Sequence, residues 1–189
     1  MKVIGLVCSP RPGGNTEILV GEALAGAKEA GSDVELVSLA GKSIAPCDAC
    51  RACVKTGKCH IKDDMQEIYR KLEAADGIIM GTPVYFANVS AQAKLLIDRT
   101  YALLWTRKLM GKVGGVVTVA RRIGGGNVLS ILYTFFAAQR MLTAGGTVGV
   151  ESEAVPYGEK GAVRRDERAM KEARAVGRNV VFLIGRTAK

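Results

Sequence analysis

Short apolar runs alternate with amphipathic stretches along the chain. Residues 3–7 form a continuous apolar run that stops at a turn rich in proline and glycine, which is typical of a buried strand. The next apolar residues recur at helical spacing and are Leu19, Val20, Ala23, Leu24 and Ala27. These patterns predict strands at residues 3–7, 34–39, 78–80, 115–119 and 147–150. They predict helices between Asn15 and Gly31, after Asp63, and at residues 90–105, 128–142 and 164–183, with Asn15 and Asp63 as N-caps.

Strands that alternate with helices indicate a parallel sheet covered by helices on both faces. Five such units in one domain, residues 1–189, fit an α/β fold of the flavodoxin-like, doubly wound type with strand order 2-1-3-4-5. A barrel of eight units would need a longer chain. In this order the ligand crevice lies at the carboxyl ends of strands 1 and 3, so the loops at residues 9–16 and 82–88 are the candidate ligand loops.

The loop at residues 9–16 leads into the start of a helix, where free backbone N–H groups and the helix dipole favour a phosphate. Hydroxyl groups, an arginine and flexible glycines gather there, and the candidate ligands are Ser9, Arg11, Gly14, Asn15 and Thr16. The loop is neither GxGxxG nor a Walker A motif, which disfavours a Rossmann dinucleotide site and a nucleotide triphosphatase. The alternative is an ordinary strand-to-helix turn.

The loop after the third strand places two aromatic residues at the same crevice. An aromatic shelf with backbone N–H groups at residues 84–86 suits a flat heterocycle such as a flavin, although a rigid proline turn with core aromatics is the alternative. The glycine-rich loop at residues 121–127 is a third candidate wall. The candidate contacts are Pro83, Val84, Tyr85, Phe86, Asn88, Gly124 and Gly125.

Four of the five cysteines form one compact motif, Cys47-x2-Cys50-x2-Cys53-x5-Cys59, in the connection after the second strand. Closely spaced thiolates can surround one centre, and the spacing is similar to that of iron–sulfur ligation in bacterial ferredoxins. Zinc is the rival metal, and unligated thiols are the third possibility. Cys8 is expected to be a small buried residue, and His60 a loop residue beside the centre.

Charge and composition narrow the function. The chain has 27 Lys and Arg against 18 Asp and Glu, a net charge of +9, which attracts acidic partners or only keeps the protein in solution. Aromatic residues make up only 5%, so we expect no nucleic acid partner. No run of about 20 apolar residues occurs, so we expect no membrane span. Cysteines without a secretion signal indicate a cytoplasmic protein.

Three motifs together resemble the iron–sulfur flavoproteins of the NADPH-dependent FMN reductase superfamily. They are the stretch from Ser9 to Thr16, the Pro83-Val84-Tyr85 loop with the helix at residues 92–99, and the cysteine motif followed by Asp63-Asp64-Met65. The resemblance runs from Lys2 to about Asn127 and departs from the family at residues 121–126. It implies one FMN and one 4Fe–4S cluster, held by Cys47, Cys50, Cys53 and Cys59, and a homo-oligomer, either a dimer or a tetramer.

The resemblance and the candidate sites predict electron transfer between a cluster, FMN and an acidic carrier such as a ferredoxin. No catalytic acid or base is needed for that task. The expected docking surface is basic and comprises Arg121, Arg122, Lys160, Arg164, Arg165 and Arg168. The alternative is a cluster-free NAD(P)H-dependent FMN or quinone reductase, with zinc or free thiols at the cysteine motif.

Overall fold

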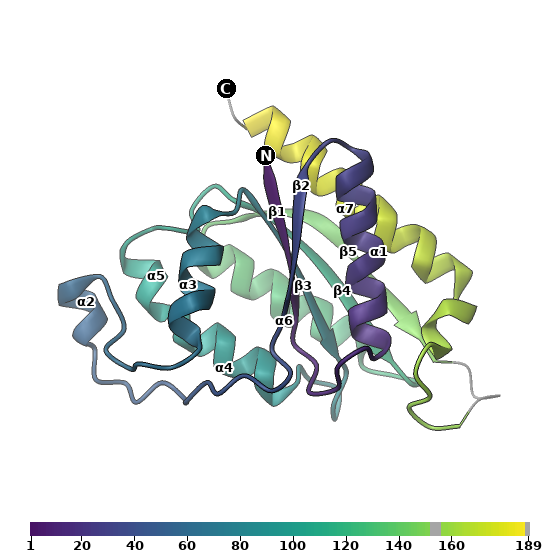
Figure 1. Ribbon diagram of the computed structural model, residues 1–189, viewed down its shortest axis with the longest axis horizontal. Coiled ribbons are helices and arrows are strands. Elements are labelled where there is room, and N and C mark those ends of the chain that lie inside the picture. The colour runs from purple at the N-terminus through teal and green to yellow at the C-terminus, as the bar shows by residue number, and fades with distance from the viewer. Residues whose placement is uncertain (152–155, 188–189) are drawn as a thin grey trace.

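A computed structural model of the chain describes residues 1–151 and 156–187. Its centre is a five-stranded sheet with the order β2-β1-β3-β4-β5, in which all neighbouring strands are parallel (Figure 1). The strands are Lys2–Val7 (β1), Asp33–Ser38 (β2), Gly77–Pro83 (β3), Val113–Ala120 (β4) and Leu142–Val150 (β5). The predicted fold class and strand order are therefore confirmed, with the cysteine motif in the connection after β2.

Helices cover both faces of the sheet. α1 and α7 lie on one face, and α3, α4, α5 and α6 lie on the other, while the short α2 projects beyond the edge of the sheet (Figure 1). The helices are Asn15–Glu29 (α1), Ala52–Thr56 (α2), Met65–Ala74 (α3), Ala91–Arg99 (α4), Tyr101–Trp105 (α5), Gly125–Ala138 (α6) and Glu167–Thr187 (α7), with a 3-10 helix at Ala162–Arg165 (η1). No helix among the described residues is long and apolar enough to cross a bilayer.

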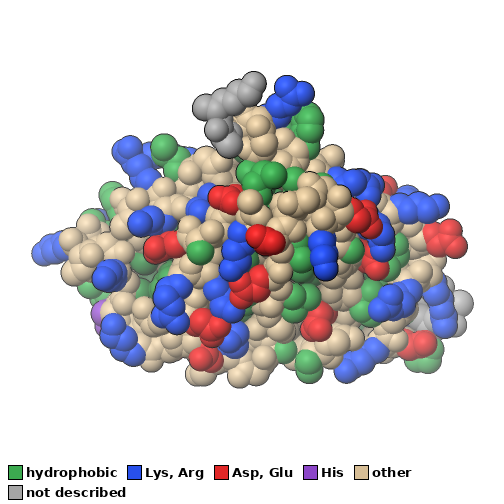
Figure 2. Space-filling model, turned by 45° about the horizontal axis from the view of Figure 1, so that its top comes forward, with side chains coloured by type: hydrophobic (Ala, Val, Ile, Leu, Met, Phe, Trp, Pro, Cys, Tyr) green, Lys and Arg blue, Asp and Glu red, His purple; other side chains and the backbone are tan. Residues whose placement is uncertain are grey.

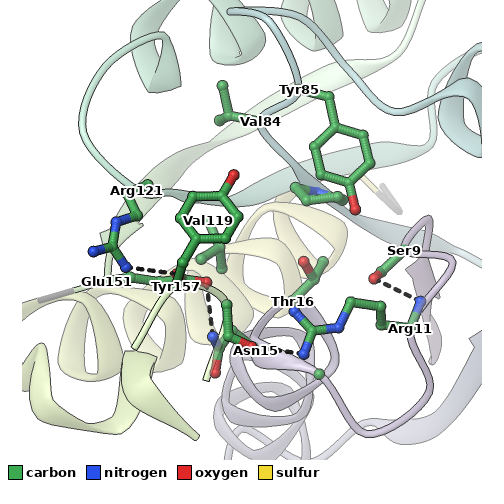
Figure 3. Close-up of a pocket in the computed structure, with 13 residues that line it drawn as sticks. Ser9, Arg11, Asn15, Thr16, Val84, Tyr85, Val119, Arg121, Glu151 and Tyr157 are labelled. Atoms are coloured by element: carbon green, nitrogen blue, oxygen red, sulfur yellow. Dashed lines mark hydrogen bonds and ion pairs between the residues drawn. The ribbon is translucent and has the colours of Figure 1, made fainter. Parts of the chain in front are cut away.

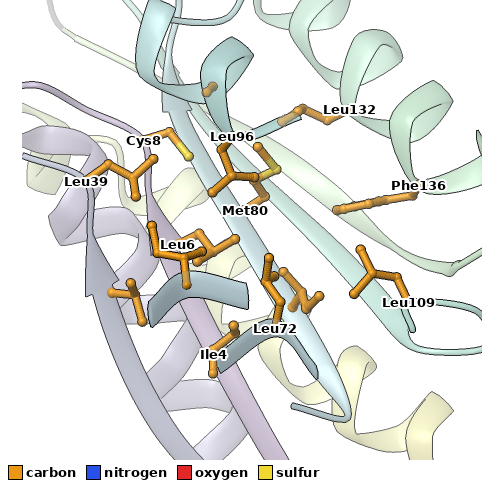
Figure 4. Packing of buried hydrophobic residues seen from close by; sticks show 14 of the residues in the cluster. Ile4, Leu6, Cys8, Leu39, Leu72, Met80, Leu96, Leu109, Leu132 and Phe136 are labelled. Carbon is orange, nitrogen blue, oxygen red and sulfur yellow. The ribbon is translucent and has the colours of Figure 1, made fainter. Parts of the chain in front are cut away.

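The sheet has an apolar core on each face because its central strands are buried on both sides. Every residue of β4 is buried, and so is all of β3 except its last residue, which explains their continuous apolar runs. Figure 4 shows the core between the sheet and helices α3, α4 and α6, where Leu6 and Met80 from the strands meet Leu72, Leu96 and Phe136 from the helices. This packing fixes the carboxyl edge of the sheet, where the candidate ligand loops begin.

Helices α1 and α7 pack with their backbones in close contact. A Cβ atom built on Gly177 would lie 1.8 Å from the carbonyl oxygen of Ala23, and one on Gly26 would lie 2.1 Å from the carbonyl oxygen of Arg174. Small residues on both helices, among them Ala27 and Ala173, complete the contact. The absence of side chains at the two glycines is therefore what lets the helices approach so closely.

Several predicted boundaries were wrong. The predicted helix at residues 90–105 is two helices, since α4 ends before Thr100, whose hydroxyl donates to the Ile97 carbonyl and whose carbonyl accepts from Gln139. The predicted helix at 128–142 instead begins at Gly125 and ends at Ala138, shortly before Arg140, which has the left-handed backbone that ends helices. Helix α2 was not predicted. Asp64 is the residue directly before α3, while the carboxylate of Asp63, the predicted cap, accepts from the Met65 N–H at 3.1 Å.

Basic and acidic side chains are interspersed on the face shown in Figure 2. Many of them pair: Lys2 and Lys71 both contact Glu35, and Arg174 bridges two glutamates of α1. Exposed pairs of this kind contribute about 0–1 kcal/mol each. On this face the basic side chains therefore do not form a separate patch.

Candidate functional site

A pocket of about 240 Å³ opens at the carboxyl ends of β1 and β3, where the strand order predicts the crevice (Figure 3). Of the predicted ligand residues, eight line it: Ser9, Arg11, Gly14, Asn15, Thr16, Pro83, Val84 and Tyr85. Two loops that lie about 70 residues apart in the sequence therefore meet at one site, as the topology requires.

The start of helix α1 forms one side of this pocket. Gly14 is the N-cap with an extended backbone, and it carries no capping side chain, so the first N–H groups of the helix are not satisfied by a side-chain cap. Ser9 and Thr16 are buried beside it. Unpaired N–H groups and the positive end of the helix dipole favour an anion at this position.

Asn15 has a different role from the predicted N-cap. Its side-chain amide donates to the Glu151 carboxylate at 2.8 Å and to the Glu159 carbonyl at 2.8 Å, and its Oδ1 accepts from the Gly161 N–H at 2.8 Å. Arg11 adds a further tie, since its Nη2 donates to the Gly158 carbonyl at 2.6 Å. The start of α1 is thus bonded to the segment after β5, which forms the opposite wall of the pocket.

Four predicted ligand residues do not line the pocket: Phe86, Asn88, Gly124 and Gly125. Phe86 is fully exposed at the tip of a turn closed by mutual backbone hydrogen bonds between Tyr85 and Asn88, each 2.9 Å long. Gly124 packs against Ala87, where a Cβ atom would lie 2.7 Å from its Cα. Their contact with a ligand therefore stays a prediction.

The expected backbone donors of this loop are also partly engaged. The Val84 N–H donates to the Val119 carbonyl at 2.8 Å, and the Tyr85 N–H donates to the Asn88 carbonyl at 2.9 Å. Two of the three N–H groups predicted to face a flavin therefore bond within the chain. The aromatic ring of Tyr85, which is 41% exposed, is what this loop offers to a ligand.

Further residues of the pocket wall come from the second half of the chain. Arg121 belongs to the loop at residues 121–127 that was predicted as a third wall, whereas Val119, Glu151, Tyr157 and Gly158 were not predicted. The Arg121 guanidinium lies 5.0 Å from the centre of the Tyr157 ring and 4.0 Å from the Glu151 carboxylate (Figure 3). Glu151 directly follows β5 at the carboxyl edge of the sheet, a signal that could have found it, whereas nothing in the sequence places Tyr157 there.

A second site gathers the cysteines. Cys47, Cys50, Cys53 and Cys59 all line one hollow of about 30 Å³, and all four are free thiols. Cys47 and Cys50 are exposed, and the other two are half-buried. Burial raises the pKa of Cys53, and the nearby thiolates of the other three cysteines raise it further. Four thiols that influence one another electrostatically around one small space form a donor set that suits an iron–sulfur cluster or a thiolate-bound metal.

His60 and Asp48 lie at the exposed rim of this hollow. Their side chains are 2.7 Å apart, and one ligand atom from each of Asp48, Cys50 and His60 falls within 4.8 Å of the others. Hydrogen bonds from Cys50 and then from His60 lower the pKa of Asp48 to about 2. Cys8 is separate from this site, since it is buried at the end of β1, and burial raises its pKa to about 12.

A buried ion pair anchors the cysteine segment to the fold. Asp63 accepts two hydrogen bonds from the Arg99 guanidinium, at 2.6 and 3.0 Å, and a third from the Ala45 N–H at 2.9 Å. The neighbouring Asp64 accepts from the Ser43 N–H at 2.6 Å. The two aspartates after the cysteine motif therefore clamp the segment that enters it.

Helix α4 connects the surroundings of the two sites. It begins next to the Tyr85–Asn88 turn, where the Ser90 hydroxyl caps it by accepting from the Ala93 N–H at 3.1 Å and donates to the Cys8 carbonyl. It ends at Arg99, which lines the cysteine hollow. The two ends of one helix, whose inner face packs in the core, therefore lie beside the two sites.

Comparison with known proteins adds the family. Residues 1–154 match the family described as NADPH-dependent FMN reductase. An iron–sulfur flavoprotein of Methanocaldococcus jannaschii is 41% identical over 97% of both chains, and one of Methanosarcina thermophila is 45% identical over 69% of both. The fold is similar to a crystal structure of RosB with a bound intermediate, 8-demethyl-8-formylriboflavin-5'-phosphate, with a TM-score of 0.78 at 16% identity, covering 98% of this chain and 79% of RosB.

The names of these relatives agree with the expected FMN and iron–sulfur cofactors, and they confirm the resemblance that the cysteine motif and the two loops indicated. The identities extend over nearly the whole of the first relative, well beyond the part of the chain in which the resemblance was seen. The chain belongs to the NADPH-dependent FMN reductase family and, within it, to the iron–sulfur flavoproteins.

Proposed function

We propose that this protein is an electron-transfer flavoprotein of the cytoplasm, a dimer or tetramer, that holds FMN in the pocket and a 4Fe–4S cluster at Cys47, Cys50, Cys53 and Cys59. Its electrons would pass between the cluster, the FMN and an acidic carrier such as a ferredoxin. The observation that carries the proposal is the convergence of four free thiols on one hollow in a chain that also opens an anion pocket at a helix N-terminus.

The pocket residues suit a flavin with a terminal phosphate. The phosphate would lie at the start of α1, within reach of Ser9, Thr16 and the Arg11 guanidinium, and Tyr85 and Tyr157 would flank the ring system. Asn15 and Arg121 engage the Glu151 carboxylate and so reduce its repulsion of an anion. When bound, FMN accepts one or two electrons and a cluster carries one, so the task of the chain is to hold both and to set their potentials.

Replacing Arg11 and Thr16 together by alanine is expected to weaken FMN retention at least about tenfold, because a hydrogen bond to a charged group contributes about 1.5–3 kcal/mol. FMN per chain after gel filtration and the Kd from flavin fluorescence measure the effect. Arg178→Ala is the matched control, since this arginine pairs with Glu29 on the outer surface of α7. Equal FMN content in the double variant and the control would show that the phosphate binds at another site.

The cluster is tested by an anaerobic absorbance spectrum together with iron, sulfide and zinc analysis. We expect iron and sulfide in equal amounts, about four of each per chain, with absorbance beyond that of the flavin. The Asp48, Cys50 and His60 side chains favour a second candidate, because mixed nitrogen, oxygen and sulfur ligands within 4.8 Å suit zinc. Stoichiometric zinc without iron would establish the alternative, a cluster-free NAD(P)H-dependent FMN or quinone reductase.

The partner is tested through ionic strength. Attraction between opposite charges speeds the encounter and weakens as the Debye length falls from about 10 Å at 0.1 M to about 3 Å at 1 M salt. We expect reduction by an acidic ferredoxin to slow markedly between those salt concentrations. Stopped-flow absorbance of the flavin measures the rate.

The structure refines the variants for this test. Arg121 belongs to the pocket wall, so the better charge reversal is Arg164→Glu with Arg165→Glu, both exposed on η1 next to the segment that closes the pocket. Lys28→Glu with Lys108→Glu changes the same charge near the amino ends of the strands, away from the pocket. A rate that responds equally to the two double variants would leave the basic surface at η1 without a role in docking.

A further inference from the structure

Arg99 is a buried cation next to the four cysteines. Its side chain has no exposed surface, and it is the largest fully buried side chain in the described part of the protein. It lies in the last turn of α4, on the face that also buries Ala93 and Leu96, and it lines the hollow that the cysteines surround. A charged group in such a position is costly unless all its donors are used.

Only some of the N–H groups of Arg99 have hydrogen-bond partners. Nη1 donates to the Ala45 carbonyl at 2.8 Å and to Asp63 at 2.6 Å, and Nη2 donates to Asp63 at 3.0 Å. The Nε–H is buried and has no hydrogen-bond partner among the described residues. An unsatisfied buried donor costs about 1–3 kcal/mol, and more when it belongs to a charged group.

If Arg99 were only a structural anchor, the hydrogen bonds of its two Nη groups would suffice for that role. The burial of the Nε–H without a partner would then have no explanation. The two Nη groups bind Asp63 bidentately and also reach the Ala45 carbonyl, and this anchor uses no hydrogen bond from the Nε–H. The Nε–H lies on the stem side of the fork and belongs to a residue that lines the cysteine hollow. Burial lowers the pKa of Arg99, but hydrogen bonds with the Asp63 and Tyr69 side chains raise it, and electrostatic interaction with Tyr69 and Cys59 adds to the rise.

We propose that Arg99 is a positioning residue of the cysteine centre whose Nε–H donates a hydrogen bond to a sulfur of the centre, while Asp63 holds the guanidinium in place. This inference rests on the proposed iron–sulfur function. Taking up one electron adds one negative charge to the centre, and no proton is required. A hydrogen bond to sulfur stabilises the reduced state more than the oxidised state, so Arg99 raises the reduction potential.

The test is a redox titration of the anaerobic holoprotein, monitored by electron paramagnetic resonance of the cluster. Arg99→Lys keeps a positive charge beside Asp63, replaces the bidentate guanidinium by a single ammonium group, and removes the Nε–H. We expect it to shift the reduced-to-oxidised ratio at a given potential about tenfold towards the oxidised state, which equals about 59 mV lower for one electron. Asp63→Asn keeps the Nε–H and removes a negative charge, so its potential is expected to rise.

The proposal predicts potential shifts of opposite sign in Arg99→Lys and Asp63→Asn. If Arg99 were only a structural anchor, both variants would lose iron or shift in the same direction. Lys94→Gln, an exposed cation on the same helix, is the control and is expected to leave the potential unchanged. An unchanged potential in Arg99→Lys with its cluster intact overturns the inference and leaves the proposed function standing. If Arg99→Lys loses its cluster, pulsed electron paramagnetic resonance of the Arg51→Lys holoprotein with 15N-labelled arginine decides, since Arg51 is the other arginine that lines the hollow. Coupling of an arginine nitrogen to the cluster supports the proposal, and its absence overturns it. A wild-type protein without iron refutes the proposed function, and the inference with it.

Discussion

Gly177→Ala is expected to destabilise the protein by about 3 kcal/mol, because the new methyl group would lie 1.8 Å from the Ala23 carbonyl oxygen. That atom belongs to the backbone of α1 and cannot rotate away, so α1 and α7 must separate. Separation would loosen the core that covers one face of the sheet. Urea unfolding at equilibrium, followed by circular dichroism, measures the free energy of unfolding.

Gly185→Ala on the same helix is the matched control. No atom lies within 4 Å of a Cβ built there, so alanine only improves helix propensity and is expected to stabilise by up to about 1 kcal/mol. Opposite signs for the two variants would show that the close helix contact, and not glycine content, matters. A similar small change in both would mean that the helices are further apart in solution than in the structure.

Alanine at any one of Cys47, Cys50, Cys53 or Cys59 is expected to abolish or degrade the iron centre while FMN stays bound. A four-thiolate centre loses a ligand in each case, and the FMN pocket uses none of the four side chains. Iron, sulfide and FMN per chain, measured on protein prepared anaerobically, test both parts of this prediction.

Cys8→Ala provides the comparison within the same residue type. Cys8 is fully buried in the core beneath α4 and does not line the cysteine hollow (Figure 4). Its removal is expected to leave the iron content unchanged. Iron loss in Cys8→Ala together with iron retention in Cys59→Ala would show that the centre has a different ligand set from the proposed one.

The sequence predicted those features that depend on local patterns of residues. The alternation of apolar runs and amphipathic stretches predicted the sheet, and the β1 loop led directly to the pocket side formed by Ser9, Arg11 and Thr16. The spacing of the cysteines predicted their convergence on one hollow, since two-residue gaps keep thiols close whatever the surrounding fold. In the β1 loop and the cysteine motif the relevant residues lie within a few positions of one another.

The sequence was uninformative where distant segments meet. Asn15 reads as an N-cap because asparagine favours that position, but tertiary contacts with Glu151 and Gly161 recruit its side chain instead. Tyr157 reaches the pocket through a loop, and no periodicity indicates where a loop residue points. Nothing in the sequence marks Arg99 as buried, and the structure shows both its burial and its pairing with Asp63.

The placement of α4 sets the geometry of any electron path between the two sites. The helix has nine residues and is about 14 Å long, and it is capped by Ser90 at the pocket end and anchored through Arg99 at the cysteine end. A hydrogen-bonded helix packed in the core behaves as a spacer of constant length. For cofactors held as proposed, the separation between donor and acceptor within one chain is therefore a property of the rigid interior, and motion of the exposed Phe86 turn or of the rim around His60 would leave it unchanged.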